Sequence, residues 1–169
     1  LARLMIVRSS NLATNLLVAQ LGASAIQASA RRLGADSIVV LRGVEDQKAY
    51  DRGLSNTTTA RDLAVLLAAI AQGRAASDSS SAIMLTILSQ QQFRAGIPAG
   101  IPPGTRVASK TGNITGVNHD AAVISRYPGW QPVPGRVVGG ELPLVEVALR
   151  DPLDAAHHGR RAGAARRQP

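Results

Sequence analysis

The sequence predicts an α+β fold in which a helical region precedes an antiparallel sheet. Apolar residues recur at helical spacing over roughly the first ninety positions. Beyond residue 105 the pattern changes to short apolar runs that are typical of strands. Apolar residues make up 45% of the 169 residues, which is enough for the packed core of one domain.

Local start and stop signals define the expected helices. Residues 1–8 have the pattern of a helix end, and Ser9-Ser10-Asn11 interrupts it with small polar residues that favour helix caps. Gly22 and Gly34 end the next two helical stretches, because glycine is common just after a helix. Thr59-Ala-Arg-Asp62 has the pattern of a capping box. The helices expected from these signals span residues 11–21, 23–33, 60–72 and 82–93.

The remaining segments are expected to be strands and loops. Residues 37–41 form a short β-prone run, and residues 42–56 have mixed charge and no clean period, which indicates a loop of functional length. Three prolines make residues 97–104 a rigid connector. Residues 105–111 and 120–126 are expected to form a hairpin that turns through residues 112–116.

The composition changes at residue 125. The last 45 residues hold seven Arg, six Pro and six Gly. We therefore divide the chain into a domain over 1–124 and a divergent tail over 125–169, with one possible strand at 142–149. Residues 157–169 are rich in Ala, Gly and Arg, and we expect them to be disordered.

Composition excludes several classes of protein. Collagen, coiled coils and acidic disordered chains do not have these proportions, and no apolar run approaches the ~18–20 residues that a bilayer helix needs. The chain has no cysteine, and its three histidines (His119, His157 and His158) have no metal-ligand spacing, so we expect no metal. The net charge of +8 could attract nucleic acid, but the basic residues scatter outside the tail and aromatic residues are few. A binding module of that kind remains an alternative, which a salt-titrated gel shift with and without residues 157–169 would test.

Two short motifs carry the candidate chemistry. Lys110-Thr111-Gly112 ends a predicted strand, where a lysine must face solvent or lie in a polar cleft, since burying an unpaired ammonium costs several kcal/mol. Ser9-Ser10-Asn11 begins a helix, and capping alone would explain it.

Together the two motifs resemble the Ser-Asx-Asn and Lys-Thr-Gly signatures of class A β-lactamases and penicillin-binding proteins. The connector over 91–112 and Asn56-Thr-Thr-Thr59 are also similar to that superfamily, and the resemblance covers about residues 1–124. It implies a β-lactamase/transpeptidase-like fold and a serine hydrolase that opens β-lactam amide bonds through an acyl-enzyme. It further implies no cofactor, a small-molecule β-lactam or peptidoglycan stem peptide as substrate, and a secreted or periplasmic location.

The resemblance also assigns roles to individual residues. Ser9 matches the serine that relays a proton to the leaving nitrogen, and Asn11 matches the asparagine that binds the acylamido carbonyl of the substrate. Lys110 would hold the substrate carboxylate and help to set the proton affinity of Ser9, and Thr111 would hydrogen-bond that carboxylate. Gly112 lets a ligand approach the backbone, and Asn113 would supply an oxyanion-hole N–H.

The sequence departs from the family in three places. Only Lys48 and Lys110 are lysines, and neither belongs to a Ser-x-x-Lys motif, so we expect the nucleophile upstream of Leu1, a truncated fold with an incomplete sheet, and an inactive fragment. Ser10 stands where the family has aspartate, and Asn56 stands where an aspartate pairs with the loop arginine, here Arg42. Glu45 is the candidate for activating the deacylating water. The alternatives are a D-Ala-D-Ala peptidase or penicillin-binding protein, and a non-catalytic β-lactam- or peptidoglycan-binding relative.

Overall fold

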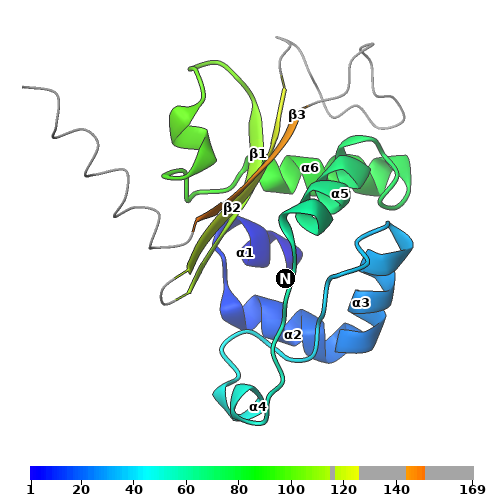
Figure 1. Cartoon of the computed structure of the whole chain (residues 1–169). Coiled ribbons are helices and arrows are strands. Elements are labelled where there is room, and N and C mark those ends of the chain that lie inside the picture. Colours follow the sequence, from blue (N-terminus) through cyan, green and yellow to red (C-terminus); the bar gives the residue numbers. More distant parts are fainter. Residues whose placement is uncertain (115–116, 126–143, 151–169) are drawn as a thin grey trace, which may run out of the picture.

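A computed structural model describes residues 1–114, 117–125 and 144–150. Within these ranges, Figure 1 shows a three-stranded sheet with the connector on one side and α-helices on the other. The fold is therefore α+β, as the sequence predicts. The helices are α1 (Ala2–Val7), α2 (Asn11–Leu21), α3 (Ala23–Arg32), α4 (Gln47–Asp51), α5 (Ala60–Ala71) and α6 (Asp78–Ser89), with a 3-10 helix η1 (Ile97–Gly100).

The sheet is antiparallel throughout, in the order β1 (Val107–Ile114), β2 (Val117–Ile124) and β3 (Leu144–Arg150). Lys110 pairs with Ala121 and Thr111 pairs with Asp120. Because neighbouring residues in a strand point to opposite faces, these two pairs divide between the two sides of the sheet. Within the described residues β1 lies at one edge, so one side of the Lys110–Gly112 segment has no partner strand.

The core divides between the same two faces. Ala108, Ala121 and Val123 pack against Leu67 and Ala71 of α5 and Leu85 and Leu88 of α6. On the opposite face, Val107, Ala122 and Ile124 pack against Ile97 and Ile101 of the connector. The predicted connector thus covers one face of the hairpin and fixes where the strand that carries Lys110 lies.

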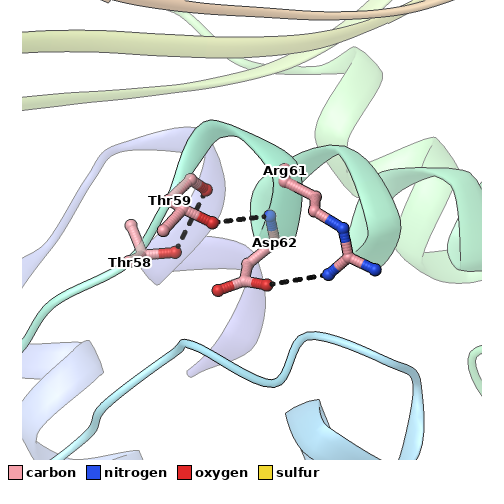
Figure 2. Close-up of polar contacts among 4 residues, drawn as sticks. All are labelled: Thr58, Thr59, Arg61 and Asp62. Carbon is pink, nitrogen blue, oxygen red and sulfur yellow. Dashed lines mark hydrogen bonds and ion pairs between the residues drawn. The ribbon is translucent and has the colours of Figure 1, made fainter.

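At the N-terminus of α5, only one of the two hydrogen bonds of a capping box forms. The Thr59 hydroxyl accepts a hydrogen bond from the Asp62 N–H at 3.1 Å (Figure 2). Asp62 does not return a bond: its buried carboxylate has no hydrogen bond and lies 3.8 Å from the Arg61 guanidinium. The usual partner at this position is Glu or Gln, whose longer side chain reaches back to the cap. The sequence therefore predicted the start of α5 correctly, but of the two reciprocal hydrogen bonds only the one to Thr59 is present.

Several predicted boundaries were wrong for local reasons. Residues 37–41 make only an isolated bridge, Val39 to Thr57, because the side chains of Gln27 and Asn56 accept from the N–H groups of Val40 and Leu41. The loop over 42–56 contains α4, which is capped by Asp46.

The other differences concern α6 and the strands. Ser77 caps α6, so this helix begins four residues before the predicted start at residue 82 and ends four residues before residue 93. β1 extends to Ile114, which places Gly112 and Asn113 within the strand rather than in the turn. The predicted strands over 120–126 and 142–149 correspond to β2 and β3. No helix in the described ranges is long and apolar enough to cross a membrane. The expected disorder over 157–169 lies outside the described residues.

Candidate active site

The turn between α1 and α2 presents Ser9 to the sheet. Ser9 has a φ of +52°, in the left-handed region that non-glycine residues rarely adopt, and the Ser10 N–H donates to the carbonyl of Leu4 at 3.2 Å. Backbone conformations of this kind cost of order 1 kcal/mol and often occur at functional sites. Ser9 thus lies in the turn that joins the two helices.

A distant segment holds this turn in place. The buried Gln91, just after α6, donates from its side-chain amide to the carbonyl of Ile6 at 2.6 Å. Its neighbour Gln92 donates its backbone N–H to the carbonyl of Val7 at 3.3 Å. These bonds satisfy carbonyls at the end of α1 that have no partner within the helix. Gln91 was not among the residues that the sequence singled out, because a lone glutamine after a helix gives no signal of its partner.

Lys110 reaches Ser9 across 101 positions of sequence. Its ammonium donates to the Ser9 Oγ at 2.8 Å and also to the carbonyl of Thr111. Burial lowers the pKa of Lys110 below the usual value for lysine, and the negative charge of Asp120 opposes part of that effect. Since Ser9 accepts from the ammonium, its own hydroxyl proton is free to be donated elsewhere. Ser9 can therefore donate its proton outward, while the charge of Lys110 stabilises the oxygen that remains.

The rest of the Ser9-Ser10-Asn11 motif serves two purposes. Ser10 caps α2 by accepting from the Ala13 N–H at 3.2 Å, so this part of the motif has the capping role that the sequence allowed. Asn11 is the first residue of α2; its side chain is half-buried and makes no hydrogen bond to another described residue. Its amide is available to a ligand next to Ser9.

The candidate binding residues of β1 fall into two groups. Thr111 and Asn113 line a groove of about 960 Å³ between the connector and the face of the hairpin that also carries Asn118 and Asp120. Gly112 is exposed, and a Cβ there would meet no atom within 4 Å. Packing therefore does not require glycine at this position, and the missing side chain leaves open space beside the strand.

The side-chain amide of Asn56 joins the two ends of the loop over 42–56. The Asn56 Oδ1 accepts from the N–H groups of Leu41 and Arg42 at 2.8 and 3.1 Å, and its Nδ2 donates to the carbonyl of Arg42 at 2.9 Å. The Arg42 guanidinium donates to the carbonyls of Leu54 and Gly43 and lies 5.5 Å from the centre of the Tyr50 ring. Asn56 thus closes the loop with hydrogen bonds to the backbone, at the position where the family that the sequence resembles has an aspartate paired with the loop arginine.

Asn15 ties the same loop to α2. Its side-chain oxygen accepts from the Val44 N–H at 2.6 Å, and its amide nitrogen donates to the Val44 carbonyl at 3.0 Å. A Cβ on Gly43 would lie 2.6 Å from the Asn15 Oδ1, so the loop approaches α2 too closely for a side chain at that position. Sequence reasoning missed Asn15, whose partner is 29 positions away.

Glu45 does not join the Ser9–Lys110 pair. Its side chain is exposed, has no hydrogen bond to another described residue, and follows the clamped Val44 with a φ of +58°. The structure therefore brings Ser9 and Lys110 together, places Thr111 and Asn113 along the groove on the opposite face of the hairpin from Lys110, and leaves Glu45 on the surface of its loop. No group of three or more His, Cys, Asp or Glu among the described residues could hold a metal ion.

Comparison with known proteins decides the family. The family model for the β-lactamase enzyme family matches residues 1–133, which is most of the chain. The chain belongs to the β-lactamase enzyme family. The family match includes both Ser9-Ser10-Asn11 and Lys110-Thr111-Gly112, the two motifs on which the resemblance rested.

Solved structures agree with this assignment. A β-lactamase from Sphaerobacter thermophilus is 35% identical, with a TM-score of 0.68 over 73% of this chain and 47% of that one. PBP-A is 34% identical, with a TM-score of 0.65 over 73% of this chain and 45% of its own. A β-lactamase from Xanthomonas campestris, at 21% identity and a TM-score of 0.69 over 88% of this chain and 53% of that one, shows the fold alone. The chain thus spans about half the length of these proteins. Among curated proteins, no sequence matches it.

Proposed function

We propose that this chain forms the carboxylate-binding and proton-relay part of a serine hydrolase that opens the amide bond of β-lactams through an acyl-enzyme. The hydrogen bond between the Lys110 ammonium and the Ser9 Oγ, at 2.8 Å, carries the proposal. A half-buried lysine in β1, the edge strand of the described sheet, with a hydroxyl as partner, suits the binding of a carboxylate next to a proton relay. Membership of the β-lactamase family supports the same reaction class.

The nucleophile would come from a Ser-x-x-Lys motif, which this sequence does not contain. Its oxygen would attack the lactam carbonyl while the lysine of the same motif takes up the proton of the attacking hydroxyl. As the carbon–nitrogen bond breaks, the Ser9 hydroxyl would give its proton to the leaving nitrogen and regain one from that lysine. Lys110 would stay protonated, hold the substrate carboxylate and help to set the proton affinity of Ser9. Asn11 would bind the acylamido carbonyl, Thr111 would hydrogen-bond the carboxylate, and the backbone N–H of Asn113 would stabilise the oxyanion.

The position of Glu45 favours a second candidate function, in which the acyl-enzyme is hydrolysed only slowly. Hydrolysis of the acyl-enzyme needs a base that can activate a water molecule beside the acyl group. The exposed Glu45 carboxylate lies on its loop and does not join the Ser9–Lys110 pair. A long-lived acyl-enzyme is the behaviour of a penicillin-binding D-Ala-D-Ala peptidase. One of the similar structures is a mutant of PBP-A in an acyl-enzyme complex with penicillin G. With a substrate of either kind, the protein would act outside the cytoplasm, as a secreted or periplasmic enzyme.

Labelling with a fluorescent penicillin tests the proposal. The chain alone should form no covalent adduct, whereas a protein that joins it to a Ser-x-x-Lys segment should form one that persists through gel electrophoresis. An adduct on the isolated chain would place the nucleophile within these 169 residues and overturn its assignment. A longer protein that has the motif and still forms no adduct would favour the non-catalytic relative.

Replacing Gly112 by alanine separates binding from folding. A methyl group at this position meets no protein atom, so the free energy of unfolding should stay the same or rise by up to about 1 kcal/mol. The same methyl group would occupy the open space beside β1, and we expect acylation by penicillin to slow by about 10–100-fold. Urea unfolding and the rate of adduct formation measure the two effects. Gly100→Ala is the control, because its Cβ also meets nothing within 4 Å; equal acylation by both variants would contradict a ligand position beside Gly112.

A further inference from the structure

Asp120 is a buried carboxylate in the hairpin that carries Lys110. Its side chain is only 6% exposed, although it lies on the face of the hairpin that borders the groove. A carboxylate is rarely buried so completely without a partner that compensates for lost hydration. The contacts of Asp120 therefore require an explanation.

One oxygen of Asp120 braces the connector. The Asp120 Oδ2 accepts from the Ile97 N–H at 2.8 Å, at the start of η1. A Cβ on Gly96 would lie 2.2 Å from the same oxygen, so the backbone of the connector passes directly over the carboxylate. The other oxygen, Oδ1, is buried and has no hydrogen-bond partner. The carboxylate is thus fixed in place while its charge is not neutralised by a direct ion pair among the described residues.

The register places this charge next to Lys110. Asp120 pairs with Thr111 and Ala121 pairs with Lys110, so the two charged residues occupy adjacent rungs on opposite faces of the hairpin. No direct hydrogen bond joins them, and their charges interact through the hairpin. The negative charge of Asp120 raises the pKa of Lys110, against the larger lowering caused by burial. Burial raises the pKa of Asp120, and the backbone N–H groups of Ile97 and Ala121 and the charge of Lys110 oppose that effect.

Other charged residues lie on the elements around the hairpin. Among the described side chains, only Asp120 has a charge that shifts the pKa of Lys110. The charged or titratable residues on the neighbouring elements are Arg3 and Arg8 at α1, Arg61 and Asp62 on α5, Asp78 on α6, Arg94 and Arg106 beside η1 and β1, His119 on β2, and Glu146 and Arg150 on β3.

We propose that Asp120 is a positioning residue of the active site, which braces the connector against β2 and supplies, from the far face of the hairpin, the counter-charge for the Lys110 ammonium. The inference rests on the proposed function in one respect, namely that a charged Lys110 is what binds the substrate carboxylate. Asp120 touches neither substrate nor nucleophile in this scheme. It raises the fraction of Lys110 that is protonated at a given pH, and it positions the connector that forms one wall of the groove.

Lysine titration by NMR tests the counter-charge without any catalytic step. The chain contains only Lys48 and Lys110, so selective ¹³C-lysine labelling gives two side-chain signals, and the exposed Lys48 is an internal reference. Asp120→Asn keeps an oxygen that can accept from the Ile97 N–H but removes the charge. We expect the titration midpoint of Lys110 to move to lower pH in this variant while the Lys48 signal does not change. Asp36→Asn, which removes an exposed carboxylate, is the matched control for net charge and should move neither signal.

Hydrogen exchange tests the brace. The Ile97 amide should be protected in the wild type and in Asp120→Asn, and it should exchange at least tenfold faster in Asp120→Ala, which has no acceptor. An unchanged Lys110 midpoint in Asp120→Asn would overturn the counter-charge, and an unprotected Ile97 amide in the wild type would overturn the brace. Neither measurement requires acylation. A protein that includes the Ser-x-x-Lys segment, forms no penicillin adduct and still shows both effects would therefore refute the proposed function and leave the brace and the counter-charge standing.

Discussion

Removing the Ser9 hydroxyl is expected to slow acylation by about 10²–10⁴-fold, the range typical of a lost general acid–base group. Ser9→Ala and Ser9→Gly should lose this activity equally, because both lack the oxygen that accepts from Lys110. They should differ in stability. Alanine must keep the φ of +52°, whereas glycine adopts it without strain, so Ser9→Gly should be about 1 kcal/mol more stable than Ser9→Ala.

The kinetic measurement uses the protein that joins this chain to a Ser-x-x-Lys segment, and the stability measurement uses urea unfolding of the chain itself. Lys110→Met removes the ammonium and keeps much of the side-chain volume. If Ser9 and Lys110 act as one relay, the double variant should be little slower than the slower single variant, since groups that act as a unit are not additive. Fully additive losses would show that the two residues act separately.

The pH dependence of acylation gives a further check on the same pair. Burial lowers the pKa of Lys110, so the ammonium loses its proton at a lower pH than an ordinary lysine does. Because the protonated form binds the substrate carboxylate, the wild-type rate should fall as the pH rises through that lowered pKa. The fall should be absent in Lys110→Met, which has no proton to lose there.

Sequence reasoning predicted the elements whose ends are set by local residues. Both ends of α2 agree with prediction, because the Ser10 side chain caps the first turn and Gly22 follows the last residue. The start of α6 was missed because its first turn is made of polar residues that also suit a linker. The same is true of α4, a five-residue helix whose cap at Asp46 gives no apolar period.

The site itself was predicted only in part. Nothing in the local pattern joins Ser9 to Lys110, and it was the resemblance to a family that placed the two in one site. Asn15, Gln91 and Asp120 were missed, since each is defined by a backbone group 23 to 85 positions away in sequence. A lone amide or carboxylate in a helix or strand has no periodicity that would reveal such a partner. The sequence predicted the groups that suit the chemistry, and the structure adds the groups that hold them.

Replacing Gly96 by alanine is expected to destabilise the chain by about 2–5 kcal/mol, a large part of the total for one domain. The new Cβ would lie 2.2 Å from the Oδ2, 3.0 Å from the Cγ and 3.2 Å from the Cβ of Asp120. Asp120 is buried, so moving it away from the methyl group would break its bond from the Ile97 N–H and leave that donor without an acceptor. Urea unfolding at neutral pH measures the loss.

Two further variants show whether the loss comes from this contact or from a general intolerance of the connector to substitution. Gly100 is the last residue of η1, which Gly96 precedes, and a Cβ at Gly100 meets nothing within 4 Å, so Gly100→Ala should stay within about 0.5 kcal/mol of the wild type. Asp120→Ala removes the Oδ2 and Cγ atoms, which are the two nearest to the new methyl group, and leaves only the Cβ at 3.2 Å. Gly96→Ala combined with Asp120→Ala should therefore be more stable than the sum of the single losses predicts, by about 1–3 kcal/mol. If the two losses simply add, the connector does not lie against Asp120, and the brace that holds this wall of the groove must be sought elsewhere.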